Sequence, residues 1–179
     1  GANALDANTT GNYNTAVGYF ALSANTTADR NVAMGNSALT ATTTGENNTA
    51  VGDRALKANT TASNNIAVGK DALLANTTGT QNVAIGYRAA DAVTDQSNIV
   101  AIGFDALGAN NVAVGYGALV ANTTASNNTA VGKSALLSNT TGTANHAFGE
   151  SALDAVTTGS FNVGIGKDAG GAITTANEN

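Results

Sequence analysis

The sequence predicts an all-β fold, a parallel β-solenoid of eleven coils, from three observations. A unit of 17 residues, G-x-x-A-L-x-A-N-T-T-G-x-x-N-x-A-V, repeats along the whole chain of 179 residues. This unit is too short for a pair of helices, which needs more than about thirty residues, but it suits one coil of short strands and turns. Small residues dominate it, so backbones of neighbouring coils must lie close together. We therefore expect one repeat domain over residues 1–179.

A glycine opens each unit and defines the register of the repeat. The glycines recur every 17 residues, except for one interval of 12, at Gly1, Gly18, Gly35, Gly52, Gly69, Gly86, Gly103, Gly115, Gly132, Gly149 and Gly166. The shorter unit, which begins at Gly103, lacks the T-T-G-x-x stretch but keeps every strand position. This stretch is therefore predicted to be a peripheral loop.

Two segments of each coil are predicted to be strands, N-x-A-V-G (for example 48–52) and A-L-x-A (for example 55–58). Stacked coils would place equivalent residues about 4.8 Å apart. The apolar column before the glycine and the Leu column are predicted to fill the interior. Accordingly, Val68→Asp should destabilise the fold far more than Lys70→Asp, because a buried unpaired charge is costly. Two columns of Asn are interpreted as structural, because Asn suits turns and stacked amides bond from coil to coil.

The N-x-A-V strands are apolar on both sides. Val or Ile alternates with Thr, and once with His146, before the central Ala, and these residues share a face with the Val column while the Ala faces the other way. Burial on both sides predicts a partner, and we expect a homotrimer. Neither end carries the polar cap that solenoids need for solubility, which predicts a segment of a longer fibre or end-to-end stacking.

The motif N-x-A-V-G-x-x-A, as in residues 48–55, resembles the head repeats of trimeric autotransporter adhesins. With its A-N-T-T-G extension it is also similar to repeats in long tail fibres of bacteriophages. The resemblance covers all eleven units. It implies a left-handed parallel β-roll, three identical chains around an axis and binding on the outer surface. The 17-residue unit is longer than the usual adhesin coil.

Composition and motifs argue against several other functions. Seven Lys and Arg, spread thinly, make no basic patch for nucleic acid. No apolar run approaches the roughly 20 residues that span a bilayer. The single histidine has no Cys or second His with which to hold a metal, and the acidic residues are scattered rather than paired. The sequence thus predicts a protein that is not an enzyme, with no catalytic residues, no metal and no cofactor.

The two residues after each glycine vary most, and they collect five of the eight aromatic residues. Aromatic side chains mixed with charges can contact a surface glycan or a protein receptor, or cover the seam of a trimer. The candidate contact surface comprises Tyr19, Phe20, Tyr87, Arg88, Phe104, Asp105 and Tyr116. Three of these rings, Tyr87, Phe104 and Tyr116, occupy one slot in consecutive units and should align along one edge, beside the shortened coil.

These observations predict a fibre or adhesin segment that attaches to a cell surface. It would be extracellular, on a bacterial surface or a virion. A purely structural filament is the alternative. An ice-binding solenoid is favoured least, because adjacent Thr residues would face opposite ways on a strand and the short unit deletes them.

Overall fold

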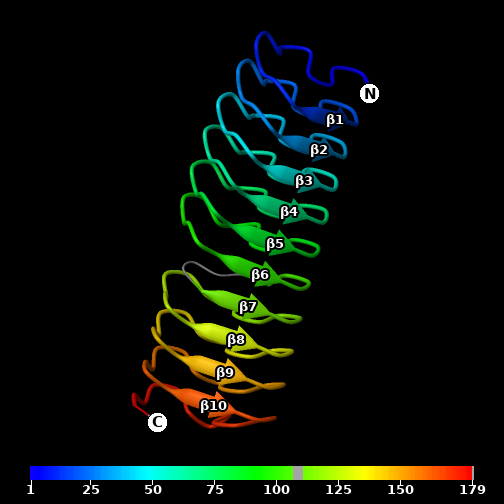
Figure 1. Ribbon diagram of the computed structural model, residues 1–179. Coiled ribbons are helices and arrows are strands. Elements are labelled where there is room, and N and C mark those ends of the chain that lie inside the picture. The colour runs from blue at the N-terminus through cyan, green and yellow to red at the C-terminus, as the bar shows by residue number, and fades with distance from the viewer. Residues whose placement is uncertain (107–110, 179) are drawn as a thin grey trace. The chain divides into compact units, whose positions relative to one another are not determined.

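The computed structural model describes residues 1–106 and 111–178 and comprises two compact units, Gly1–Ser97 and Asn98–Asn179. Both are built from the same coil, and the described residues form short strands and turns without a helix. The strands run parallel and have three residues each (Figure 1): β1 (Thr15–Val17), β2 (Val32–Met34), β3 (Thr49–Val51), β4 (Ile66–Val68), β5 (Val83–Ile85), β6 (Val100–Ile102), β7 (Val112–Val114), β8 (Thr129–Val131), β9 (His146–Phe148) and β10 (Val163–Ile165).

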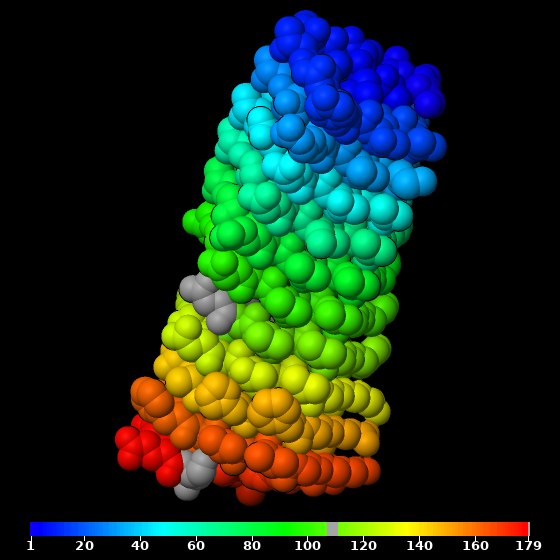
Figure 2. Space-filling view, viewed as in Figure 1, coloured from blue at the N-terminus to red at the C-terminus, as the bar shows by residue number. Residues whose placement is uncertain are grey.

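The predicted parallel β-solenoid is therefore confirmed, with ten strands and about nine turns for eleven glycine-led repeats. Each repeat opens with its glycine and has its strand at the end, and the last repeat, residues 166–179, stops before the place of a strand, so the number of strands is one fewer than the number of repeats. Consecutive coils form successive layers within each compact unit (Figure 2).

Strand register follows the repeat in both units. In the first unit each central Ala pairs with the Ala of the next coil, as Ala50 does with Ala67. In the second unit the shortened repeat preserves this register, because Ala101 of β6 pairs with Ala113 of β7. The prediction that the deletion leaves the strand columns intact is confirmed, whereas Leu107 and Asn110 of the predicted Leu and Asn columns lie outside the described residues.

Turns between strands depend on left-handed backbone conformations. Gly52 has a φ of 139°, and a Cβ there would lie 2.5 Å from the carbonyl oxygen of Gly69. The Leu of A-L-x-A is also left-handed, with a φ of 51° at Leu56. A residue in that region cannot continue a strand. The prediction of a second strand at A-L-x-A is thus wrong, and these segments are turns.

The interior contains only one of the two apolar columns that were expected to fill it. The Leu column is buried as expected, with Leu56 and Leu73 fully inaccessible. The strands contribute their central Ala to the interior, for example Ala67, rather than the Val column. Val68 is only half-buried and lies on the outward face. The predicted placement of the Val column inside the coil is therefore wrong.

One Asn column forms a continuous hydrogen-bonded ladder through the interior. This asparagine ladder consists, in the first unit, of Asn14, Asn31, Asn48, Asn65 and Asn82. The amide oxygen of Asn48 accepts from the backbone N–H of Asn65 at 3.0 Å, and the side-chain nitrogen of Asn65 donates to the Gly79 carbonyl at 2.9 Å. The same pattern recurs in the second unit. The structural interpretation of these residues is confirmed.

The T-T-G stretch of the full-length coils is not a peripheral loop. It forms one side of the coil, and its last position is buried, as at Gly45, Ala62 and Gly79. In most pairs the first Thr donates its hydroxyl to a carbonyl of the next coil, for example Thr60 to Thr77 at 3.2 Å. This stretch is therefore part of the stacked architecture.

The side chains of the second Asn column matter less for stability than those of the asparagine ladder. The side chain of Asn139 donates to the Gly142 carbonyl at 2.9 Å, but its own buried oxygen has no partner. Gly142 also accepts a hydrogen bond from Asn128, so removing the Asn139 amide leaves that carbonyl paired. The chain itself carries Val156 at the next position of this column.

We predict that Asn139→Val changes the free energy of unfolding by less than about 1 kcal/mol, because it removes an unpaired buried acceptor without orphaning another group. Asn128→Val should cost at least about 2 kcal/mol, since it leaves the backbone N–H of Asn145 without its acceptor. Urea denaturation of both variants is the measurement. Equal losses would contradict this difference between the columns.

Candidate interaction surfaces

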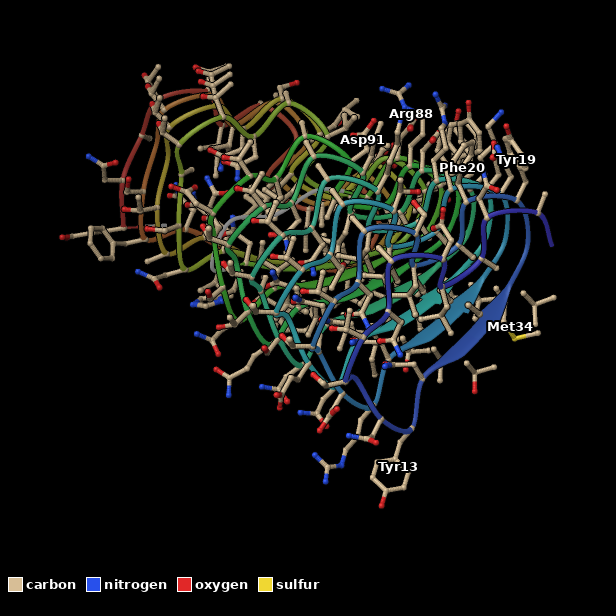
Figure 3. The ribbon with its side chains drawn as sticks, turned by 90° about the horizontal axis from the view of Figure 1, so that it is seen from above. Tyr13, Tyr19, Phe20, Met34, Arg88 and Asp91 are labelled. Atoms are coloured by element: carbon tan, nitrogen blue, oxygen red, sulfur yellow. The ribbon has the colours of Figure 1, made fainter. Side chains whose placement is uncertain are left out.

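The largest apolar surface is the outward side of the strands, which we call the sheet face. It consists of the two residues that flank the central Ala of each strand. In the first unit it contains Thr15, Val17, Val32, Met34, Thr49, Val51, Ile66, Val68, Val83 and Ile85. Met34, Ile66 and Ile85 are 44%, 41% and 39% exposed, and Figure 3 shows Met34 pointing away from the coil.

The second unit has the same kind of surface. Its sheet face contains Val100, Ile102, Val112, Val114, Thr129, Val131, His146, Phe148, Val163 and Ile165. An apolar strand face this regular is unusual on a monomeric surface, where apolar residues are usually scattered. Its residues form two apolar columns in the sequence, and one of these, the Val column, lies on the sheet face instead of in the predicted interior.

The candidate contact residues divide between the two compact units. Tyr19, Phe20, Tyr87 and Arg88 belong to the first unit, and Phe104, Asp105 and Tyr116 to the second. The rings of Tyr19 and Phe20 meet edge to face with centroids 4.2 Å apart. Arg88 pairs with Asp91 at 2.7 Å, and Figure 3 places both pairs near one corner of the coil.

Stacking of neighbouring coils brings Phe104 and Tyr116 together as the shared slot predicts. Their rings are nearly parallel, at 10°, with centroids 5.3 Å apart, and both side chains are exposed. Because each ring turns one face toward the other, those two faces are not available to a partner. The predicted uncovered surface beside them depends on residues 107–110, which lie outside the described residues.

Charged side chains form short ladders along the same variable slots. Arg54 donates to the carboxylate of Asp71 at 2.7 Å, and Asp71 is almost fully buried. The hydrogen bond to Asp71, followed by the charge of that carboxylate, raises the pKa of Arg54 above its already high ordinary value. Arg54 therefore stays charged throughout the usual pH range, and the pair fixes neighbouring coils in register.

A third surface is a row of threonine. The second Thr of each T-T pair is exposed, at Thr27, Thr44, Thr61 and Thr78 of the first unit. These residues lie outside the strands, so adjacent Thr residues need not face opposite ways here as they would on a strand. The deletion of the pair in the short repeat still interrupts the row.

Comparison with known proteins gives no relative: no family model, no curated protein and no solved structure matches this sequence. Among the described residues, no helix is long and apolar enough to cross a membrane. No group of three or more His, Cys, Asp or Glu side chains that could hold a metal occurs in the described part of the chain.

Proposed function

We propose that this chain is a non-enzymatic segment of an extracellular fibre or adhesin, on a bacterial surface or a virion, which assembles as a homotrimer and attaches to a cell surface. The sheet face carries this proposal. It turns apolar side chains outward along every described strand, and a chain that remained alone would leave them in contact with solvent. The resemblance of the repeats to fibre and adhesin heads supports the same reading.

A second copy of this chain is the occupant that the sheet face fits best. Its side chains recur at the spacing of the coils, so a second copy brought alongside presents ridges with the same period. The face combines β-branched side chains with no Lys, Arg, Asp or Glu, and the cores of homo-oligomeric interfaces are likewise apolar and poor in charge. Ten such residues in the first unit alone approach half of the roughly 20–30 residues that a standard interface uses on each side.

If the sheet face is taken up by association, the variable slots are the surface that we propose for attachment. Aromatic rings dominate contact energies because they bury a large area at little entropic cost. Of the residues in these slots, Tyr87, Phe104 and Tyr116 expose rings in consecutive repeats. A surface glycan or a protein receptor could contact their edges.

We predict that replacing Tyr87, Phe104 and Tyr116 together by Ser lowers attachment to cells or to a glycan array at least about tenfold, which corresponds to roughly 1.4 kcal/mol. Tyr13→Ser is the matched control, because Tyr13 is 80% exposed at a different corner. A thermal melting curve checks that the triple variant still folds. Unchanged attachment by a folded triple variant would exclude these three rings as contacts, and lost folding would assign them to the trimer seam.

A structural filament without a receptor is the alternative, and it predicts that neither variant changes attachment above background. The exposed threonine row favours a second candidate, an ice-binding surface. That function predicts thermal hysteresis that disappears when Thr44, Thr61 and Thr78 are replaced by Lys, whereas the attachment proposal predicts no thermal hysteresis in either protein.

A further inference from the structure

The sheet face of the second unit contains one histidine, His146. His146 begins β9, at a position occupied by Thr129 in β8 and by Val163 in β10. It is exposed and projects outward, on the opposite side of the strand from the buried Ala147. It lies on the same face as Phe148, so the imidazole belongs to the surface that association would cover.

Nothing on the adjacent strands compensates a charge on this imidazole. Strands β8 and β10 contribute Thr129, Val131, Val163 and Ile165 to the face, and none of them titrates. The first charged residues after β8, β9 and β10 are Lys133, Glu150 and Lys167, each directly after the glycine that follows its strand, and Glu150 pairs with both lysines at 3.5 and 3.7 Å.

We propose that His146 makes association of this chain sensitive to pH, with copies held together at neutral pH and loosened in mild acid. This inference rests on the proposed assembly through the sheet face. In a cyclic trimer each copy contributes the same residue at the same level. Three His146 side chains would then enter one interface, where protonation introduces like charges into an apolar setting.

The direction of the pH dependence follows from the linkage between proton binding and association. Burial disfavours the charged imidazolium, whereas water solvates it in the separated chains, so separated chains bind protons more readily. Association is then strongest at high pH and weakens as the pH falls through the range of about 5–8 in which histidine titrates. A net uptake of one proton per trimer on dissociation lowers the association constant about tenfold per pH unit.

The test is sedimentation equilibrium of the full chain at pH 7.5 and pH 5.5, with circular dichroism at both values to show that the coils remain folded. His146→Thr is the key variant, because Thr already occupies the same column at Thr129 in the neighbouring strand. His146→Lys carries a permanent charge and should be weakly associated at both pH values. The expected result is an association constant at least about tenfold lower at pH 5.5 for the wild-type chain and almost unchanged for His146→Thr.

Two outcomes would overturn the inference and leave the proposed assembly intact: equal association of the wild-type chain at both pH values, or the same pH response in His146→Thr, which would assign the effect to carboxylates. A folded monomer at both pH values would instead overturn the assembly itself, and this inference with it.

Discussion

Ala67→Asp is expected to abolish stable folding, while Val68→Asp, one residue further along β4, leaves the coil folded. Ala67 is completely buried and pairs with Ala50 and Ala84 in the neighbouring strands. A carboxylate there would be an unpaired charge in a closed interior, at a cost of at least about 3 kcal/mol. Val68 points outward and is half-buried in the single chain, so its replacement should cost the coil only about 1 kcal/mol.

The two variants should also differ in association. Val68→Asp places a charge on the sheet face, so we expect a folded chain that no longer self-associates. Far-ultraviolet circular dichroism during urea titration measures the fold, and sedimentation velocity measures the assembly. Comparable loss of structure in both variants would show that Val68, and not only Ala67, faces the interior.

Asn65→Asp should destabilise the fold by at least about 3 kcal/mol at neutral pH, although it replaces only the amide group of the side chain by a carboxylate. The amide nitrogen of Asn65 donates to the Gly79 carbonyl at 2.9 Å. A carboxylate oxygen in its place would face that carbonyl oxygen and repel it, and the new charge would be buried without a cation.

Asn64→Asp is the matched control for this substitution. Asn64 is exposed and has a φ of 63°, a conformation that Asp also adopts readily. The cost should be close to zero. Since burial raises the pKa of a carboxyl group, the carboxylate introduced by Asn65→Asp would bind a proton more tightly in the folded state than in the unfolded state. The difference between the two variants should therefore narrow as the pH falls toward about 4. Equal melting temperatures at neutral pH would contradict the role assigned to the ladder.

The fold itself could be predicted from the sequence because the regular interval between repeats fixes the register of neighbouring coils. A strict interval of 17 residues requires equivalent residues to stack. The one interval of 12 shows which residues can be deleted without changing the strands. The orientation of the strand could not be predicted in the same way. Side chains alternate along a strand, so Ala67 and Val68 must face opposite ways, but this alternation does not say which of them faces inward. Large apolar residues are usually the buried ones, which favoured Val68.

The cross-section of the coil decides that orientation. Seventeen residues close around an interior that holds one Leu, such as Leu73, together with Ala and Asn side chains. A column of Val or Ile in addition to Leu would overfill it. The left-handed conformation of Leu73, with φ of 50°, could not be predicted either, because Leu has no intrinsic preference for that region.

The candidate contact residues show the same mixture of success and failure. Their shared slot correctly predicted that Phe104 and Tyr116 lie on adjacent coils. Ring orientation depends on side-chain torsions that the repeat does not specify, so the parallel stacking at 5.3 Å could not be foreseen. The sequence places His146 in the column before the central Ala, but its exposure depends on which side of β9 faces out.

Sedimentation equilibrium of the wild-type chain at neutral pH tests most directly whether the sheet face is an interface between identical copies. The account predicts a single folded species with a mass three times the 17.5 kDa of the chain, stable on dilution into the micromolar range. A folded species of 17.5 kDa at every concentration would contradict it, because the exposed Val and Ile columns would then have no partner.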